Sequence, residues 1–157
     1  MPFAKLIGLG LLAVCGALCG VWLAGFERAK CRQAEAFVDL IRNVRLQIDC
    51  FSTPLGTILA SLDDKLYAAL GAPRAKDLST LLSQTVLLVD RELAKHLWDF
   101  AAALGSGYRE EELRYCDHYL ALLAPLAQKA RNELEKRIKL AFILPLSLSA
   151  ALILLLW

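Results

Sequence analysis

The chain has 157 residues, of which 57% are hydrophobic and 22% are charged, with 18 basic and 16 acidic side chains. An apolar fraction this high is unusual for a soluble domain. The near balance of charge argues against a nucleic-acid-binding protein, which normally carries a clear basic excess.

Two uncharged apolar runs lie at opposite ends of the chain, and every charged residue except Lys5 lies between them. The runs are Leu6 to Phe26 and Leu140 to Trp157. As helices they would reach roughly 31 Å and roughly 27 Å, enough to cross a hydrocarbon core. Because unpaired backbone groups are costly in lipid, both runs are predicted to be transmembrane helices. The sequence therefore predicts a transmembrane helix within 1–26, a soluble domain over 27–139 and a second transmembrane helix over 140–157.

The orientation follows from the basic residues that flank the two runs. They are Arg28, Lys30, Arg32, Arg131, Lys136, Arg137 and Lys139. By the positive-inside rule, these residues place 27–139 in the cytoplasm and both termini on the far side of the membrane. No A-x-A cleavage pattern follows the first run, so it is predicted to remain as an anchor.

A helix without breakers is predicted from Glu27 to about Cys50, continuing from the first apolar run. Its apolar residues recur at spacings of three and four, which is typical of an amphipathic helix. Thr53 is predicted to cap a second helix through its hydroxyl, with Pro54 at the first helical position. This second helix is expected to end at Gly71-Ala72-Pro73.

Two further helices are predicted before residue 108. The first begins near Asp77 and carries Thr85 and Val86 on its apolar face. Asp90 is predicted to cap the next one, and Gly105 to end it in a left-handed conformation.

The last helix is predicted to begin near Tyr108 and to reach the second apolar run, with Pro125 as a point of kinking or division. Glu110, Glu111 and Glu112 lie in its first turn, where the helix dipole favours negative charge. No segment alternates like a strand. The predicted fold class is all-α: a cytoplasmic bundle of about five or six helices flanked by two transmembrane helices.

The sequence offers little that could support catalysis. It has no glycine-rich phosphate loop, and His96 and His118 have no cysteine or carboxylate at metal-ligand spacing. The acidic pair Asp63-Asp64 is read as part of a solvated helix face. We therefore predict no enzyme activity, no cofactor and no metal site.

Two features indicate interaction with other helices. Gly16 and Gly20 form a small-xxx-small pattern that lets another helix approach closely. The partner could be the second apolar run, a foreign helix or a second copy of the chain, and the sequence leaves these open. Trp98 is expected in the core, with an exposed docking patch as the alternative, whereas Trp22 and Trp157 are expected at membrane interfaces.

Several segments taken together resemble one known family. They are the start Lys5-Leu6-Ile7-Gly8, the glycine-rich first run, Ser52-Thr53-Pro54-Leu55, the Leu104-Gly105 pair before a long charged helix, and the apolar run at the end. This order resembles the stage III sporulation protein AB family of endospore-forming bacteria.

The resemblance implies a helical domain similar to the cytoplasmic domain of the inner-membrane platform proteins of type II secretion and type IV pilus machines. It implies a place in a channel between mother cell and forespore, in the mother-cell membrane around the forespore. The implied partners are other channel subunits and a cytoplasmic ATPase, stage III sporulation protein AA.

Three classes of function are compatible with this architecture. The first is a non-catalytic platform that docks the ATPase and the channel subunits. The second is a membrane-tethered adaptor or regulator that binds a soluble cytoplasmic factor. The third is an enzyme acting on lipid or membrane substrates, which would need polar residues converging in a pocket at the membrane end of the domain.

Overall fold

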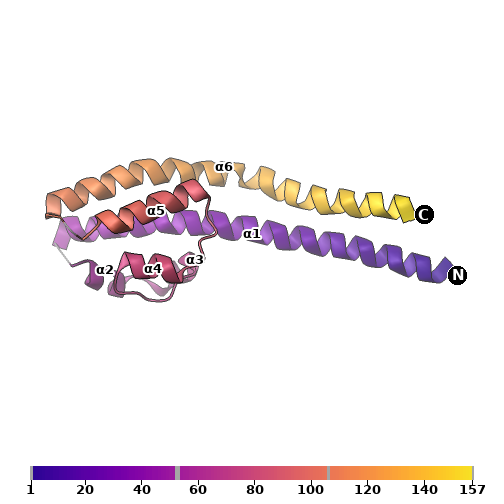
Figure 1. Ribbon diagram of the computed structural model, residues 1–157, viewed down its shortest axis with the longest axis horizontal. Coiled ribbons are helices and arrows are strands. Elements are labelled where there is room, and N and C mark those ends of the chain that lie inside the picture. Colours follow the sequence, from indigo (N-terminus) through magenta and orange to yellow (C-terminus); the bar gives the residue numbers. More distant parts are fainter. Residues whose placement is uncertain (1, 52–53, 106, 157) are drawn as a thin grey trace. The chain divides into compact units, whose positions relative to one another are not determined.

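The computed structural model describes residues 2–51, 54–105 and 107–156, and among these it describes no side chain at 2–7, 9, 12, 51, 153, 155 and 156. The described part contains helices and no strand, which confirms the all-α prediction (Figure 1). The helices are α1 (Pro2–Phe51), α2 (Leu55–Ser61), α3 (Asp64–Leu70), α4 (Leu78–Gln84), α5 (Arg91–Ala103) and α6 (Arg109–Leu156).

The chain forms two compact units. Unit 1 consists of Met1–Ala29 with Asn132–Trp157, and unit 2 consists of Lys30–Arg131. Unit 2 lies within the predicted soluble segment 27–139 and contains α2 to α5 together with parts of α1 and α6.

Unit 2 is built around the apolar stripe of α1. Residues spaced by three and four on this helix are buried, and they include Phe37, Ile41, Val44 and Ile48. Within this unit α2, α3 and α4 lie on one side of α1, and α5 lies beside α6 (Figure 1). Aromatic packing joins α5 to α6, because the rings of Phe100 and Tyr119 meet edge to face at 5.4 Å between centroids.

The segment predicted as one helix up to Gly71 is two helices. The Asp63 carboxylate accepts a hydrogen bond from the Lys65 backbone N–H and caps α3, while Leu62 is extended. A capping aspartate at this point starts a new helix rather than continuing the old one. Pro54 lies one position before the first residue of α2, not within it. Thr53, the predicted cap, lies outside the described residues.

Two aspartates at predicted helix starts behave differently. A helix begins beside Asp77, as predicted, and Asp77 caps this helix, α4, by accepting from the Thr80 backbone N–H at 3.1 Å. Asp90 precedes α5 but forms no side-chain cap, because its carboxylate pairs with Lys30. Val86 was predicted on the apolar face of the helix that begins beside Asp77. It lies instead in the linker after α4, where its side chain is 76% exposed.

The end of α5 and the course of α6 were predicted from Gly105 and Pro125. Gly105 has φ of 96° just after α5, as its predicted role required. Pro125 does not divide α6, which is continuous over Arg109–Leu156.

A buried glutamine of α1 connects several parts of unit 2. Gln33 is 3% exposed, and its Nε2 donates to the carbonyl oxygens of Leu70 and Val86 at 2.8 and 2.9 Å. Its Oε1 accepts from the Leu88 backbone N–H at 2.7 Å. These backbone groups come from the end of α3 and from the non-helical linker between α4 and α5, so one side chain satisfies groups that no helix satisfies.

Charged side chains connect α1 and α6 within unit 2. Arg45 pairs with both carboxylate oxygens of Asp117, at 2.5 and 3.3 Å, and this contact lowers the pKa of Asp117. Arg109, at the start of α6, donates to the backbone carbonyl oxygens of Ile48 and Asp49 near the end of α1. A cation at these carbonyls also complements the negative end of the helix dipole.

Unit 1 contains two helical segments that pack closely. Gly16 and Gly20 of α1 are buried, and a Cβ built on Gly16 would lie 2.7 Å from Ser149 Oγ and 3.2 Å from the Pro145 carbonyl oxygen. A Cβ on Gly20 would lie 2.8 Å from the ring of Phe142. Within unit 1, therefore, the small-residue stripe faces the chain's own α6.

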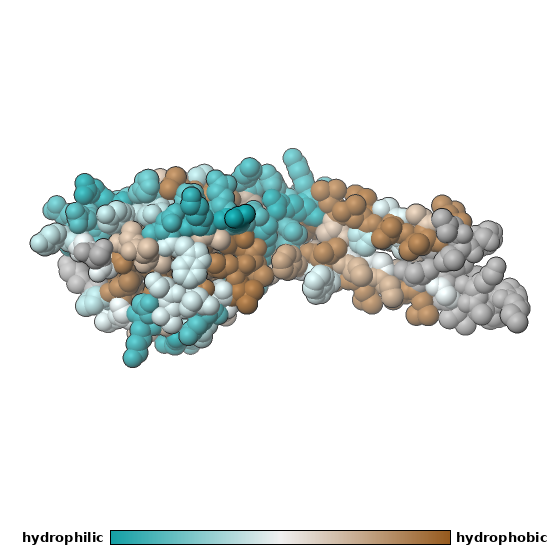
Figure 2. All heavy atoms as spheres, viewed as in Figure 1, coloured by the Kyte–Doolittle hydropathy of each residue, from teal (hydrophilic) through white to brown (hydrophobic). Residues whose placement is uncertain are grey.

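Most of the exposed large apolar side chains also lie in unit 1. They are Leu11, Val14, Leu18, Val21, Trp22, Leu23, Phe26, Leu140, Phe142, Ile143, Leu144, Leu146, Leu148, Leu152 and Leu154. In Figure 2 hydrophobic residues, drawn in brown, cover much of the described part of this unit. Among the residues that the structure describes, no helix combines the length and the apolarity needed to cross a membrane. Leu6, Ile7, Leu9, Leu12, Ile153 and Leu155 to Trp157, which belong to the two apolar runs of the sequence, are outside the described side chains.

Replacing Gln33 by leucine should lower the free energy of unfolding by about 2–4 kcal/mol. Three backbone groups would lose their partner, and each buried unsatisfied group costs about 1–3 kcal/mol before relaxation. Gln84→Leu is the matched control, since Gln84 is exposed on α4, and should change stability by less than about 0.5 kcal/mol. Thermal unfolding of the full chain in detergent micelles would measure both; equal losses would contradict the role of Gln33.

Replacing Gly16 by leucine should move the two segments of unit 1 apart by about 1–3 Å, toward the spacing of ordinary helix pairs. Gly10→Leu is the control, because nothing lies within 4 Å of a Cβ at Gly10. Electron spin resonance distances between labels at Val21 and Ile143, with exposed native cysteines replaced by serine, would report the change. An unchanged distance in Gly16→Leu would show that the contact does not hold the pair together.

Candidate docking groove along α1

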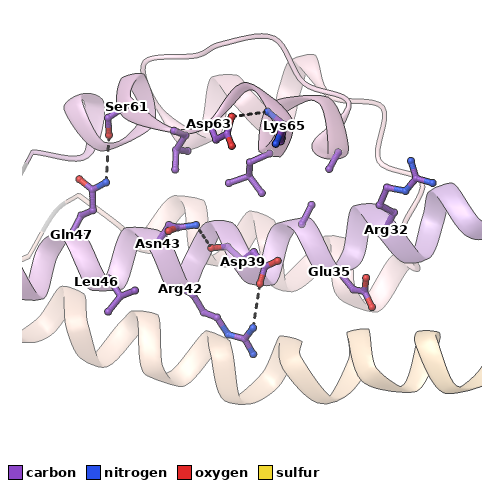
Figure 3. Close-up of a pocket in the computed structure, with 14 residues that line it drawn as sticks. Arg32, Glu35, Asp39, Arg42, Asn43, Leu46, Gln47, Ser61, Asp63 and Lys65 are labelled. Atoms are coloured by element: carbon purple, nitrogen blue, oxygen red, sulfur yellow. Dashed lines mark hydrogen bonds and ion pairs between the residues drawn. The ribbon is translucent and has the colours of Figure 1, made fainter.

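A groove of about 680 Å³ runs along one face of α1 in unit 2, with α2 and α3 forming its opposite wall (Figure 3). The α1 wall is Arg32, Glu35, Ala36, Asp39, Arg42, Asn43, Leu46 and Gln47, and the opposite wall is Ser61, Leu62, Asp63, Lys65, Leu66 and Ala69. The α1 residues recur at spacings of three and four, so they form a stripe along one helix face. This stripe is accessible from the groove.

Hydrogen bonds hold the polar side chains of the groove in place. At one end Gln47 Nε2 donates to Ser61 Oγ at 3.4 Å, which joins the two walls. In the middle Asn43 Nδ2 donates to the backbone oxygen of Asp39 at 3.0 Å, and Arg42 pairs with the Asp39 carboxylate at 3.2 Å. Figure 3 shows these contacts along α1. These contacts orient the side chains of Arg42, Asn43 and Gln47 within the groove.

The groove also contains apolar surface. Leu46 is 53% exposed although it lies between the core residues Val44 and Ile48 in the sequence. Leu66 and Ala69 of α3 are partly buried and pack against the core while lining the groove. A partner side chain placed here would cover apolar area that water now contacts, which is favourable at about 25 cal/mol per Å².

The charges of the groove are unevenly neutralised. The Glu35 carboxylate pairs with Arg131 at 3.3 Å, and Asp39 pairs with Arg42. Arg32 and Lys65 are exposed and form no ion pair with any side chain that the structure describes. The carboxylate of Asp63, which also lines the groove, accepts from the Lys65 backbone N–H and forms no ion pair with the described side chains. The groove thus offers two cations and one carboxylate without ion-pair partners beside apolar surface, and the two cations favour a segment that carries acidic as well as apolar side chains.

A second cavity of about 190 Å³ lies between α1 and α6 of unit 2. It shares Glu35, Asp39 and Arg42 with the larger groove. These three residues therefore form a charged ridge between two depressions. A partner that follows α1 could contact the ridge from either side.

The basic residues predicted to flank the membrane fall into two groups. The first group forms ion pairs. Lys30 pairs with Asp90 at 2.5 Å and Arg131 with Glu35 at 3.3 Å. Arg137 pairs with Glu27 at 3.7 Å and with Glu133 at 3.0 Å. The other group is exposed and makes no ion pair with the described side chains. It consists of Arg28, Arg32, Lys136 and Lys139.

The remaining candidate residues do not converge on a reactive centre. The expectation that Trp98 is a core residue is wrong, since it is 43% exposed on α5. The ring of His118 packs against Tyr119, and the described residues contain no group of three or more potential metal ligands. Burial raises the pKa of Cys116 to about 11, so this thiol stays protonated at neutral pH.

The groove and the hydrogen bonds of Gln33 were not predicted from the sequence. A signal for Gln33 was present, because it shares the buried face of α1 with Phe37 and Ile41, where a polar side chain must find partners. The groove has no comparable signal. The wall of the groove opposite α1 depends on the break between α2 and α3 at Asp63. Because one continuous helix was predicted here, the position of Lys65 beside α1 could not be predicted.

Comparison with curated proteins and with solved structures gives no significant match. The family model of stage III sporulation protein AB, in contrast, matches residues 5–157, which is nearly the whole chain. All the segments that suggested this family from the sequence lie within the matched range. The chain belongs to the stage III sporulation protein AB family, and its role is in sporulation.

Proposed function

We propose that the chain is a non-catalytic membrane platform of a secretion-like sporulation channel between mother cell and forespore. In this proposal unit 2 is cytoplasmic and docks the ATPase stage III sporulation protein AA together with other channel subunits. The observation that carries the docking role is the groove along α1, where two cations without ion-pair partners lie beside an exposed leucine. Family membership supplies the sporulation context.

Membrane insertion is the second part of the proposal. Its support is the pair of uncharged runs in the sequence, Leu6 to Phe26 and Leu140 to Trp157, and the exposed apolar surface of unit 1 (Figure 2). A monomer in water rarely exposes a continuous apolar surface of this kind, whereas lipid chains would cover it. The close packing at Gly16 and Gly20 is typical of helix pairs in membranes.

The groove is suited to a partner helix. A helix laid along the α1 stripe could place one or two apolar side chains against Leu46 and Leu66 while acidic side chains reach Arg32 and Lys65. Such helix-in-groove contacts combine apolar anchors at helical spacing with charges that set the orientation. The remaining contacts would exclude water around these few residues, which usually carry most of the binding energy.

Docking can be tested with purified full-length chain in detergent micelles and purified ATPase. The triple variant Arg32→Glu, Lys65→Glu, Leu46→Gln should weaken ATPase binding at least about tenfold, because it reverses two charges at the contact. Fluorescence anisotropy of the labelled ATPase would give the dissociation constant.

The matched control carries Arg91→Glu, Lys95→Glu and Val86→Gln, which are exposed residues of unit 2 outside the groove. It should bind the ATPase like the unmodified chain. The stability of both variants should stay within about 1 kcal/mol of that of the unmodified chain, since each substituted side chain is exposed. Equal weakening by the control, or undiminished binding by the groove variant, would contradict the docking face.

Topology is tested separately with alkaline phosphatase, which is active only outside the cytoplasm. A fusion after Trp157 should be active and one inserted in the Gly71-Ala72-Pro73 turn inactive, because the basic residues beside both runs should hold unit 2 in the cytoplasm. The reverse pattern would contradict the orientation, and equal activities would contradict the hairpin.

A further inference from the structure

The contacts within unit 1 fix which residues of its two segments lie at the same level. Gly20 of α1 faces Phe142 of α6, and Glu27 pairs with Arg137 at 3.7 Å. The two segments are therefore antiparallel, and the Glu27–Arg137 pair marks one level. Because a helix rises 1.5 Å per residue, Arg28, Lys136 and Lys139 lie within about 3 Å of this level along their helix axes.

These three cations are available for a ligand. Arg28, Lys136 and Lys139 are exposed and make no ion pair with the side chains that the structure describes. Three carboxylates lie nearby: those of Glu27 and Glu133 contact Arg137, and that of Glu135 is exposed, against the four cations Arg28, Lys136, Arg137 and Lys139. Positive charge therefore exceeds negative charge at this level of unit 1.

Both segments show the same order of side chains away from this level. On α1 the cation is followed toward the N-terminus by Phe26 and Trp22, whose rings stack at 6.4 Å between centroids, and Trp22 is 72% exposed. On α6 Lys139 is followed toward the C-terminus by the exposed Leu140, then by Phe142, which is 40% exposed, and by further exposed leucines. A cation followed within one turn by an aromatic ring and then by aliphatic surface matches the headgroup, interface and acyl-chain layers of a bilayer.

We infer that Arg28, Lys136 and Lys139 form a binding site for the phosphate groups of anionic phospholipids. The inference rests on the proposed membrane insertion. It goes further because it assigns a preference for negatively charged headgroups. Lysine and arginine near a membrane surface each contribute to attraction for anionic lipid, while the exposed Trp22 ring would lie at the depth of the glycerol region.

The test uses the full-length chain in nanodiscs of equal parts phosphatidylglycerol and phosphatidylcholine. Native mass spectrometry counts the phospholipids that remain bound when the nanodisc is removed. The unmodified chain should retain phosphatidylglycerol in preference to phosphatidylcholine. Each cation should raise the binding constant for phosphatidylglycerol about fivefold at low ionic strength. The preference should decrease as salt is added, because the cations are exposed.

The variant Arg28→Gln, Lys136→Gln, Lys139→Gln should lose this preference and retain the two lipids about equally. The control Arg91→Gln, Lys95→Gln, Arg114→Gln removes the same charge from exposed positions of unit 2 and should keep the preference. A preference that survives in the unit 1 variant, or is lost equally in the control, would overturn the site. Displacement of phosphatidylglycerol by soluble glycerol 3-phosphate would also overturn it, by indicating a site for free phosphate.

Failure of this inference can be separated from failure of the proposed function. Co-purification of the chain with nanodiscs measures insertion independently of headgroup choice. Insertion without lipid preference would overturn the headgroup site and leave the membrane platform intact. A chain that enters nanodiscs of neither lipid would overturn membrane insertion, and the headgroup site with it.

Discussion

The three hydrogen bonds of Gln33 stabilise the α4–α5 linker and the end of α3, whose backbone groups have no partner within a helix. The linker between α4 and α5 runs without regular structure while Val89 within it is buried, so its backbone polar groups need partners inside the protein. Gln33 supplies two donors and one acceptor to this linker and to the end of α3. Because Arg32 and Ala36 are its close neighbours on α1, the same contacts fix the spacing between the two walls of the groove.

The ion pairs of unit 2 have a different role. Lys30–Asp90, Arg45–Asp117 and Arg131–Glu35 each include a substantially exposed carboxylate, and exposed pairs contribute little stability individually. Their value lies in geometry, because each joins α1 to a residue far away in the sequence. Together with the apolar core they favour one alignment of α1 with α6, since sliding either helix by a turn would break two of the pairs at once.

The long helices could be predicted from the sequence, because their periodicity and their freedom from breakers are local properties. The caps could be predicted only in part. Asp77 and Asp90 precede helices in the same way, yet Asp77 caps its helix and Asp90 pairs with Lys30, sixty residues away. Asp63 sits inside an apolar pattern that reads as one helix, and it nevertheless starts a new one. The outcome at Asp90 depends on a tertiary contact, which overrides local preference and which a single sequence does not display. At Asp63 the cap is local, to the Lys65 backbone N–H, and the apolar pattern around it conceals the break.

The net charge of the sequence does not show how paired and unpaired charges are distributed in the structure. The middle of the sequence is nearly neutral, which argues against a nucleic-acid-binding protein, but neutrality on average permits local imbalance. In unit 2 the groove carboxylates of Glu35 and Asp39 have cationic partners. The cations of Arg32 and Lys65 and the carboxylate of Asp63 form no ion pair with the described side chains. In unit 1 a single arginine, Arg137, contacts two glutamates and leaves its basic neighbours exposed. In the proposed docking and headgroup sites, recognition would depend on which cations lack an ion-pair partner, and that property is set by the fold rather than by the composition.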